Sequence, residues 1–350
     1  MNTRNISLST NEKMGLVSNM NTMLSAGIPI LETVDSLLEG AKNNQKKLLE
    51  VLRDDLTQGR HVYESFEKFP KVFDKVTINL LKASEEAGTL EITLKDLKSS
   101  IQKESEFSDK IKSALFYPMV ILVVFGLVML LMLTFVIPRI STVFLRLKVE
   151  LPLPTRILIF VSDLILKYTV PTVIVTAVIV GGLIFLYKVK KRLIMEIFFS
   201  FPVVSKLVRE IDLTRFSRSM YLLLSSGIPI TTSLDLAKDV VLKSEIKKII
   251  ERSHEMVSAG KKMSEGLITG KGIIPSIVIK IIEAGEKTGS LDKSLQDTSE
   301  YLDYEVSNTL KSLTVLLEPL MLVFVGILIG GMMLAIIAPI YGLISQVVPK

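Results

Sequence analysis

The nearest approach to a nucleotide-binding motif in this chain is a glycine-rich run in its second half. Gly266, Gly270 and Lys271 resemble the loop whose backbone N–H groups cradle phosphate, but their spacing is one residue short. The next residue is Gly272, which supplies no hydroxyl group for Mg²⁺. We therefore interpret the run as a loop between helices and predict no nucleotide site there.

Other residue combinations that carry catalysis are also missing from the sequence. The chain has no Cys and only two His, His61 and His254, which lie far apart. Thiolate chemistry is therefore excluded, and a histidine metal site is not expected. Glu85 and Glu86 are neighbours, so on a helix their side chains diverge by about 100° and do not form an acid–base pair. The sequence predicts a protein that is not an enzyme and that holds no cofactor and no metal.

One carboxylate, Glu318, lies at the edge of a long apolar run and is followed directly by Pro319. Two interpretations are open. The side chain could pair with a basic or polar group on another helix or subunit. It could instead lie at headgroup depth near a helix N-terminus, where the helix dipole tolerates an anion. Glu318 is thus a candidate contact for a partner protein.

Apolar and charged residues are separated along the chain. Hydrophobic residues make up 49% of the sequence and charged residues 22%, with a mean hydropathy of +0.46. Uncharged runs lie at 119–137, 170–187 and 319–344, and each is long enough to cross the hydrocarbon core as a helix. We therefore expect three transmembrane helices, at 113–138, 170–187 and 312–344.

Prolines and glycines mark the ends and faces of these expected spans. Pro319 falls in the first turn of its span, where a missing N–H costs little, whereas Pro138 and Pro339 lie near the far ends of theirs. Gly326 and Gly330 form a small-residue strip that favours close helix packing. The strip predicts contact either with a span of the same chain or with another subunit.

The charges that flank the spans predict an orientation. Lys110 and Lys112 precede the first span, and a basic cluster from Lys188 to Arg192 follows the second. The positive-inside rule places both flanks, the N-terminus and the polar segments 1–112 and 188–311 in the cytoplasm. The connection 139–169 and the tail 345–350 then face outward. We expect a helix from Thr155 to about Lys167 at the outer interface, or alternatively a tilted start of the second span.

The polar segments are two copies of one unit, which makes the chain an internal repeat. Leu24–Ile30 returns 200 residues later as Leu224–Ile230, and Ala83–Leu90 returns 201 residues later as Ala284–Leu291. Helical stripes, caps and stops recur in the same order in both copies. The prediction is an all-α membrane protein with two homologous cytoplasmic helical bundles, of about six helices each by their start and stop signals.

Local signals within each copy set the expected helix ends. Ser9 and Glu12 have capping-box spacing, Gly27 stops the first helix, and Pro29 suits the first turn of the next. The last helix of each copy has no strong breaker before its apolar run. A continuous rod could therefore pass from the cytoplasm into the bilayer and transmit movement.

The ordered combination of these motifs resembles the type II secretion system F protein family, also called PilC/GspF. The resemblance rests on the two Gly-Ile-Pro-Ile segments, the Gly285–Leu291 element, Tyr117-Pro118, the Leu151–Thr155 segment and Glu318-Pro319. It implies a polytopic platform protein of a prokaryotic inner membrane, in a type IV pilus or type II secretion machine. The first copy departs from the family pattern by having Ser84 where the second has Gly285.

The resemblance also implies partners and site residues. Such platforms dock a cytoplasmic hexameric assembly ATPase and couple its motion to extraction of pilin or pseudopilin. Other inner-membrane assembly proteins, membrane lipid and further copies of the chain are implied as partners, and direct nucleic-acid binding is not. Glu286 and Glu318 are the favoured partner contacts. The residues carried over as structural are Gly27, Pro29, Glu85, Gly88, Tyr117, Pro118, Pro138, Gly227, Pro229, Glu286, Gly289, Pro319 and Pro339.

Two other functional classes stay open at this point. A membrane transporter or channel subunit predicts polar residues within the spans, and only Glu318 supplies one. A membrane-anchored enzyme predicts a catalytic motif. The sequence does not distinguish a pilus from a secretion or DNA-uptake system, and it leaves open a dimer or a larger ring.

Overall fold

The computed structural model describes residues 3–147, 153–167 and 202–347. They form two units. Met1–Lys110 and Lys206–Asn308 make up one, called here the bundle unit, and Ile111–Ser205 with Thr309–Lys350 makes up the other, the span unit. The second expected span, at 170–187, lies outside the described residues. No strand occurs within the described ranges, where an isolated bridge joins Lys271 to Ile274.

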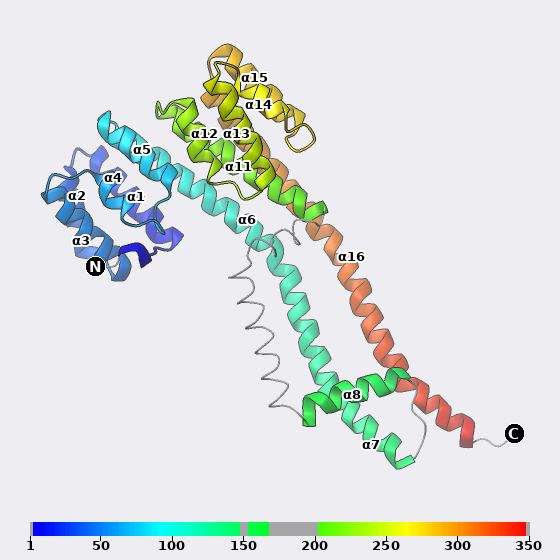
Figure 1. Ribbon diagram of the computed structural model, residues 1–350. Coiled ribbons are helices and arrows are strands. Elements are labelled where there is room, and N and C mark those ends of the chain that lie inside the picture. Colours follow the sequence, from blue (N-terminus) through cyan, green and yellow to red (C-terminus); the bar gives the residue numbers. More distant parts are fainter. Residues whose placement is uncertain (1–2, 148–152, 168–201, 348–350) are drawn as a thin grey trace. The chain divides into compact units, whose positions relative to one another are not determined.

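The first copy of the repeat forms five helices and the start of a sixth (Figure 1). Ser9 accepts a hydrogen bond from the Glu12 N–H while Glu12 bonds back to the Ser9 N–H, which confirms the capping box. A short 3-10 turn, η1 (Thr3–Asn5), precedes it. The helices are α1 (Thr10–Ser25), α2 (Ile30–Gly40), α3 (Asn43–Thr57), α4 (Val62–Glu67), α5 (Lys75–Glu86) and the beginning of α6 (Leu90–Leu131).

The second copy repeats this order. Its helices are α11 (Pro202–Ser225), α12 (Ile230–Lys238), α13 (Ser244–Ser258), α14 (Met263–Ile268), α15 (Ser276–Thr288) and the beginning of α16 (Leu291–Val347). The glycines at the ends of α1, α5, α11 and α15 all have positive φ: Gly27, Gly88, Gly227 and Gly289. This left-handed conformation suits a residue without Cβ and ends each helix.

Pro29 and Pro229 lie one position earlier than the sequence predicted. Each is the N-cap of the following helix rather than a residue of its first turn. Each has extended backbone, with φ of −57° and −54°, so the missing N–H falls outside the helix. The prolines therefore shape the corner after the glycine turn.

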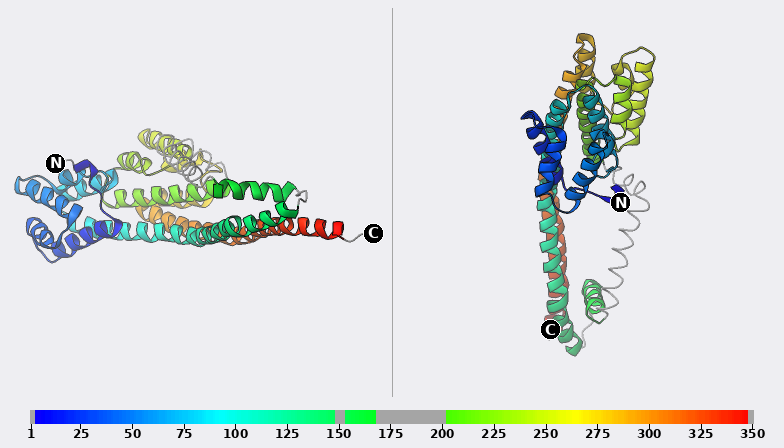
Figure 2. Two further views of the ribbon diagram at one scale, coloured as in Figure 1. Left: turned by 90° about the horizontal axis from the view of Figure 1, so that it is seen from below. Right: turned by 90° about the vertical axis from the view of Figure 1, so that its left-hand side faces the viewer.

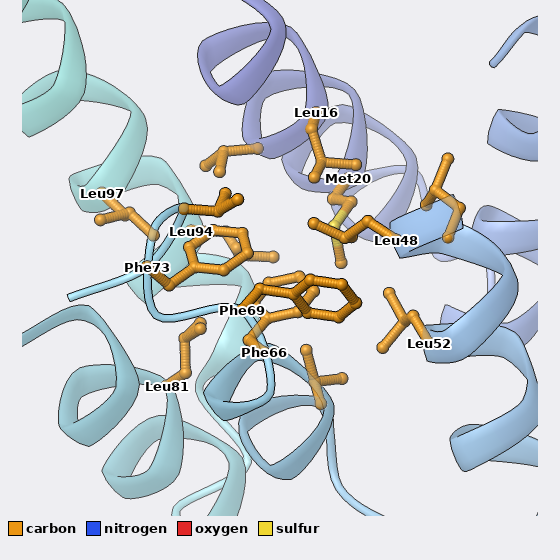
Figure 3. Packing of buried hydrophobic residues seen from close by; sticks show 14 of the residues in the cluster. Leu16, Met20, Leu48, Leu52, Phe66, Phe69, Phe73, Leu81, Leu94 and Leu97 are labelled. Atoms are coloured by element: carbon orange, nitrogen blue, oxygen red, sulfur yellow. The ribbon is translucent and has the colours of Figure 1, made fainter. Parts of the chain in front are cut away.

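Each bundle has its own apolar core. In the first, residues from α1, α3 and α4 meet the start of α6, as Figure 3 shows for Leu16, Leu48, Phe66 and Leu94. Phe66 stacks on Phe73 with ring centroids 4.1 Å apart. The other members of this first core that Figure 3 labels are Met20, Leu52, Phe69, Phe73, Leu81 and Leu97. The second bundle has a core of its own, formed by the corresponding helices.

Gly285 is needed because α15 and the start of α16 approach closely. A Cβ there would lie 2.3 Å from Ser294 Oγ and 3.1 Å from Ser290 O. The first copy accommodates Ser84 instead, which is buried and donates its hydroxyl to Leu81 O at 2.9 Å. The departure of the first copy from the family pattern is therefore a local repacking.

Two long helices carry both bundle and apolar residues. Both α6 and α16 are unbroken (Figure 2). The expectation of a continuous helix, which rested on the lack of a strong helix breaker, is therefore confirmed. Both segments Leu90–Thr142 and Leu291–Leu334 are long and apolar enough to cross a membrane. Pro118 and Pro319 lie inside these helices. The expectation that Pro319 sits in a first turn was therefore wrong, because its helix begins at Leu291.

The first apolar helix does not end near Pro138. A π-helical turn, η2 (Met132–Val136), is followed directly by α7 (Ile137–Leu147). In this turn the Ile137 N–H bonds to Met132 O, and the next residue, Pro138, has no N–H. The carbonyl of Leu133 is thereby left without a backbone donor.

A side chain from the outer connection supplies that donor. Ser162 lies on α8 (Leu153–Lys167), is buried, and donates its hydroxyl to Leu133 O at 2.6 Å. An unsatisfied carbonyl would cost free energy in an apolar environment. The predicted helix through Lys167 exists, but it begins at Leu153. Thr155, the expected first residue, therefore lies inside the helix.

Candidate functional site

Glu85 and Glu286 occupy the same place in the two bundles. The Glu85 carboxylate accepts hydrogen bonds from the backbone N–H groups of Val62 (2.9 Å) and Tyr63 (3.3 Å). Glu286 does the same for Met263 and Ser264. In both copies a carboxylate near the end of one helix therefore satisfies the first N–H groups of another.

These bonds matter because α4 and α14 have six residues each. So short a helix gains little from its own hydrogen bonds, and its first N–H groups have no partner within it. A carboxylate at that end also interacts favourably with the helix dipole. The structure thus assigns both glutamates an intrachain role, and contact of Glu286 with another protein stays a prediction.

A cluster of charges joins the two bundles within the bundle unit. Glu104 on α6 accepts from Arg215 Nε (3.1 Å) and Nη2 (2.8 Å), and from Arg218 Nη1 (3.1 Å), both on α11. Arg218 Nη2 also lies 3.4 Å from Asp303 Oδ2 on α16. One arginine therefore links α6, α11 and α16, and we call these four residues the charged joint.

Arg218 is the buried member of this joint, whereas the side chains of Arg215 and Glu104 are partly exposed. The Arg218 side chain is only 9% exposed, and its guanidinium also lies over the ring of Phe107 at 5.8 Å. Burial raises the pKa of Asp303, and attraction to Arg218 partly offsets that rise. Because its folded pKa is raised, ionisation of Asp303 at neutral pH costs folding free energy, and this cost falls as the pH is lowered. Arg218 Nε and Asp303 Oδ1 have no partner among the described residues.

The rest of the contact between the bundles combines two ion pairs with a small apolar cluster. Lys75 pairs with Asp239 at 2.7 Å, and the hydrogen bond from Lys75 lowers the pKa of Asp239. Lys103 pairs with Glu300 at 3.2 Å. The apolar part is formed by five buried side chains from α5, α11 and the turn before α12: Val76, Leu80, Leu222, Leu223 and Ile228. Each bundle core is larger than this cluster, so each bundle is packed around its own core.

Asp212 is a further carboxylate that the sequence did not single out. Its two oxygens accept from the backbone N–H groups of Leu242 (3.0 Å) and Lys243 (2.7 Å) before α13. Burial raises the pKa of Asp212, while these bonds lower it. The side chain therefore fixes the entrance of α13 against α11.

The residues expected at the membrane entrance lie at equivalent points of α6 and α16. Pro118 and Pro319 each remove the N–H that would bond to the carbonyl four residues earlier, on Ala114 and Val315. Tyr117, beside the first proline, is 50% exposed. Glu318, beside the second, is exposed and has no hydrogen-bond or ionic partner in the described part of the chain.

Glu318 does not lie near a helix N-terminus. Its helix begins at Leu291, well over three turns earlier, so the dipole of a free N-terminus does not stabilise the anion. The helix dipole therefore does not account for Glu318, and its position at headgroup depth stays untested. A partner for the carboxylate on another helix or subunit remains a prediction.

The glycine strip on α16 is open. A Cβ added to Gly326 or Gly330 would meet no atom within 4 Å among the described residues. Nearby, Phe125 of α6 and Phe324 of α16 make an edge contact with centroids 6.1 Å apart. Contact of the strip with another span or subunit therefore stays a prediction. The backbone at Pro339 continues α16 without interruption.

The glycine-rich run with Lys271 is explained by packing. Gly266 lies within α14, where a Cβ would be 2.3 Å from the Ser253 Cα of α13. At Gly270 a Cβ would be 2.6 Å from Ile249 Cδ1. The run is therefore part helix and part turn, and its glycines permit close contact with α13. No acidic or histidine cluster able to hold a metal occurs within the described ranges.

These features define a class of protein: a duplicated, all-helical chain in which each bundle continues into a long apolar helix. A family model described as "Type II secretion system (T2SS), protein F" matches the chain twice, over residues 16–138 and 216–339. Because these matches cover more than half of the 350 residues, the chain belongs to that family.

Individual relatives agree with this assignment. The chain is 32% identical to the type IV pilus assembly protein PilC of Thermus thermophilus over 328 residues, which cover 93% of this chain and 80% of that protein. It is 27% identical to the PilC of Pseudomonas aeruginosa, with 93% and 87% covered. It is 28% identical to the type II secretion system protein F of the same organism, with 92% and 80% covered.

We predict that Glu286→Ala will loosen the start of α14. Removing the carboxylate leaves the N–H groups of Met263 and Ser264 without an acceptor, a loss of about 1 kcal/mol by comparison with other helix caps. Hydrogen exchange at these two amides should accelerate several-fold. Glu283→Ala is the matched control, since the Glu283 carboxylate pairs with Lys287 on the same helix. Unchanged exchange in Glu286→Ala would contradict the capping role.

We predict that Glu104→Gln will weaken the charged joint. The substitution keeps the shape but leaves buried Arg218 with Asp303 as its one remaining carboxylate, at a cost of about 1–2 kcal/mol. Urea unfolding of the full chain in detergent, followed by far-UV circular dichroism, measures the change. Glu106→Gln on the same helix, an exposed position, should change stability by less than about 0.5 kcal/mol. Equal effects would refute the assignment.

Proposed function

We propose that this chain is the inner-membrane platform of a type IV pilus or type II secretion machine. In this role it docks a cytoplasmic hexameric assembly ATPase and couples the motion of that ATPase to extraction of pilin or pseudopilin from the bilayer. The observation that carries the proposal is the continuity of α6 and α16, which run from bundle residues into apolar residues without a break. Family membership and the names of the relatives support it.

The physical basis of coupling is the stiffness of a helix. An α-helix rises about 1.5 Å per residue and its hydrogen bonds resist stretching, so displacement of one end is passed along the axis. The charged joint ties α6 to α16 through Arg218. A force applied to either bundle is therefore shared between the two helices.

The proposed topology follows the sequence argument. The bundles lie in the cytoplasm, the residues at 170–187 form a further span, and the C-terminus lies outside. α8 lies at the outer interface, where Leu153, Ile157 and Phe160 are exposed and suit lipid. The Ser162 bond holds this helix against the first span.

Glu318 is the proposed contact for the translocated subunit. It is an exposed carboxylate beside the proline of α16, and the open strip at Gly326 and Gly330 lies on the same helix. A carboxylate in an apolar region favours a cationic or hydrogen-bonding partner, because its isolated ionised form is costly there. The N-terminal amine or a polar side chain of a pilin helix has that chemistry.

We predict that the full-length chain in detergent will bind the assembly ATPase of its own machine. The contact must involve the bundle unit, because the apolar segments are the parts that suit the bilayer. Co-elution in size-exclusion chromatography measures binding, with an unrelated detergent-solubilised membrane protein as control. Separate elution both with and without nucleotide would contradict docking.

We predict that Glu318→Gln will leave membrane insertion intact and reduce filament assembly. The substitution removes the charge but little volume, so span packing is retained. Filament counts in a strain that carries only the variant measure the effect, and immunoblots of membrane fractions measure insertion. Asp297→Asn, an exposed position on the same helix outside the charged joint, is the control. Normal filament numbers with Glu318→Gln would remove this residue from the mechanism.

A further inference from the structure

The contact between the two bundles joins one surface of the first bundle to a non-equivalent surface of the second. The first bundle contributes Val76 and Leu80 of α5 and Glu104 of α6, which we call the docking face. The second contributes Arg218, Leu223 and Ile228 of the α11–α12 corner, which we call the receiving face. Since the bundles are copies, each has both faces, and the internal contact uses only one of each. One docking face and one receiving face are left over.

The leftover docking face belongs to the second bundle. Its Ile277 and Ile281 are equivalent to Val76 and Leu80 of the first bundle. Ile277 is 45% exposed whereas Val76 is 6% exposed, and Ile281 is half-buried whereas Leu80 is buried. An apolar surface that is covered in one copy is therefore uncovered in the other.

The leftover receiving face belongs to the first bundle. Met23 and Ile28 are equivalent to Leu223 and Ile228, but they are half-buried where their counterparts are buried. Beside them a groove of about 540 Å³ runs between α1 and α6, lined by Gly15, Ser18 and Gln102 among others. These three residues stand at the positions that Arg215, Arg218 and Asp303 occupy in the second copy.

We propose that the occupant of both faces is a second copy of this chain. The docking face of the second bundle, with Ile277 and Ile281, packs on the receiving face of the first bundle of the next copy, with Met23 and Ile28. The internal contact is the template, because it joins homologous surfaces in the same order. This inference rests on the repeat geometry and does not require the platform role.

The contact between copies is weaker than the internal one. Glu305, the counterpart of Glu104, meets Gly15 and Ser18 in place of two arginines. The receiving face is also less apolar, because Thr22 and Ser36 stand where the second copy has Leu222 and Leu236. Glu106 and Asp109 also line this groove, so association rests on a small apolar contact without the arginine pairs, and salt does not weaken it. Because the faces differ, copies join head to tail, in a ring or an open row.

Cross-linking tests this arrangement directly, because the chain has no native Cys. Met23→Cys and Ile277→Cys are made as separate full-length variants with tags of different size, reconstituted together in bilayers, and treated with a short bismaleimide. We expect a covalent dimer that contains both tags when the variants are mixed. We expect no dimer from either variant alone. The double variant should give a ladder of dimers and higher multiples.

Two matched pairs serve as controls. Val76→Cys with Leu223→Cys in one chain should cross-link internally and remain monomeric. Met23→Cys mixed with Ile268→Cys tests random collision, because Ile268 is 51% exposed and lies outside both faces. An equal yield with Ile268→Cys would overturn the proposal.

Three other results would also overturn it. A dimer from Ile277→Cys alone would mean that two docking faces meet each other. Absence of the mixed dimer would mean that the faces do not meet. Protection of Ile277→Cys from maleimide by added ATPase or pilin, without any cross-link between copies, would assign the face to a different protein.

Discussion

The bundle unit depends on one buried cation with carboxylate partners from two different helices. Arg218 is held by Glu104 of α6 and Asp303 of α16, and Arg215 shares Glu104. An arginine that is 9% exposed needs these acceptors, because an unpaired buried charge is far more costly than a polar group. The apolar contact between the bundles is small, so the charged joint fixes which surfaces meet. Apolar cores make each bundle stable, and the joint makes the pair specific.

Duplication explains why the joint is not symmetric. A head-to-tail contact between two copies places different surfaces of each copy under selection. The second copy carries Arg215 and Arg218, and the first carries Gly15 and Ser18 at the same positions. The groove beside Gly15 and Ser18 is lined by Glu106 and Asp109 of the same bundle, and Glu104 does not line it. Glu104 does repeat, as Glu305, so the asymmetry of the contact comes from the arginines that only the second copy carries.

That distinction also separates what the sequence could predict from what it could not. Local residues determine where helices start, stop or continue. Local patterns were therefore sufficient to predict the capping box at Ser9, the glycine stops and the unbroken long helices. The charged joint brings together residues more than a hundred positions apart, which no local pattern records. A comparison of the copies for charges that do not repeat would have indicated Arg218 and Asp303. Glu85 and Glu286 do repeat, and their capping role is accordingly internal to each bundle.

At Pro138 the sequence predicted a helix end, but the helix continues through this residue. Near the end of an apolar run, proline is typical of a helix terminus, because it removes one hydrogen bond. Here the helix continues by widening to a π turn, and the unpaired Leu133 carbonyl is satisfied from outside by Ser162. Whether proline ends a helix thus depends on whether another element supplies the missing donor. That donor lies 29 residues away, so only the folded arrangement of α7 and α8 decides the outcome.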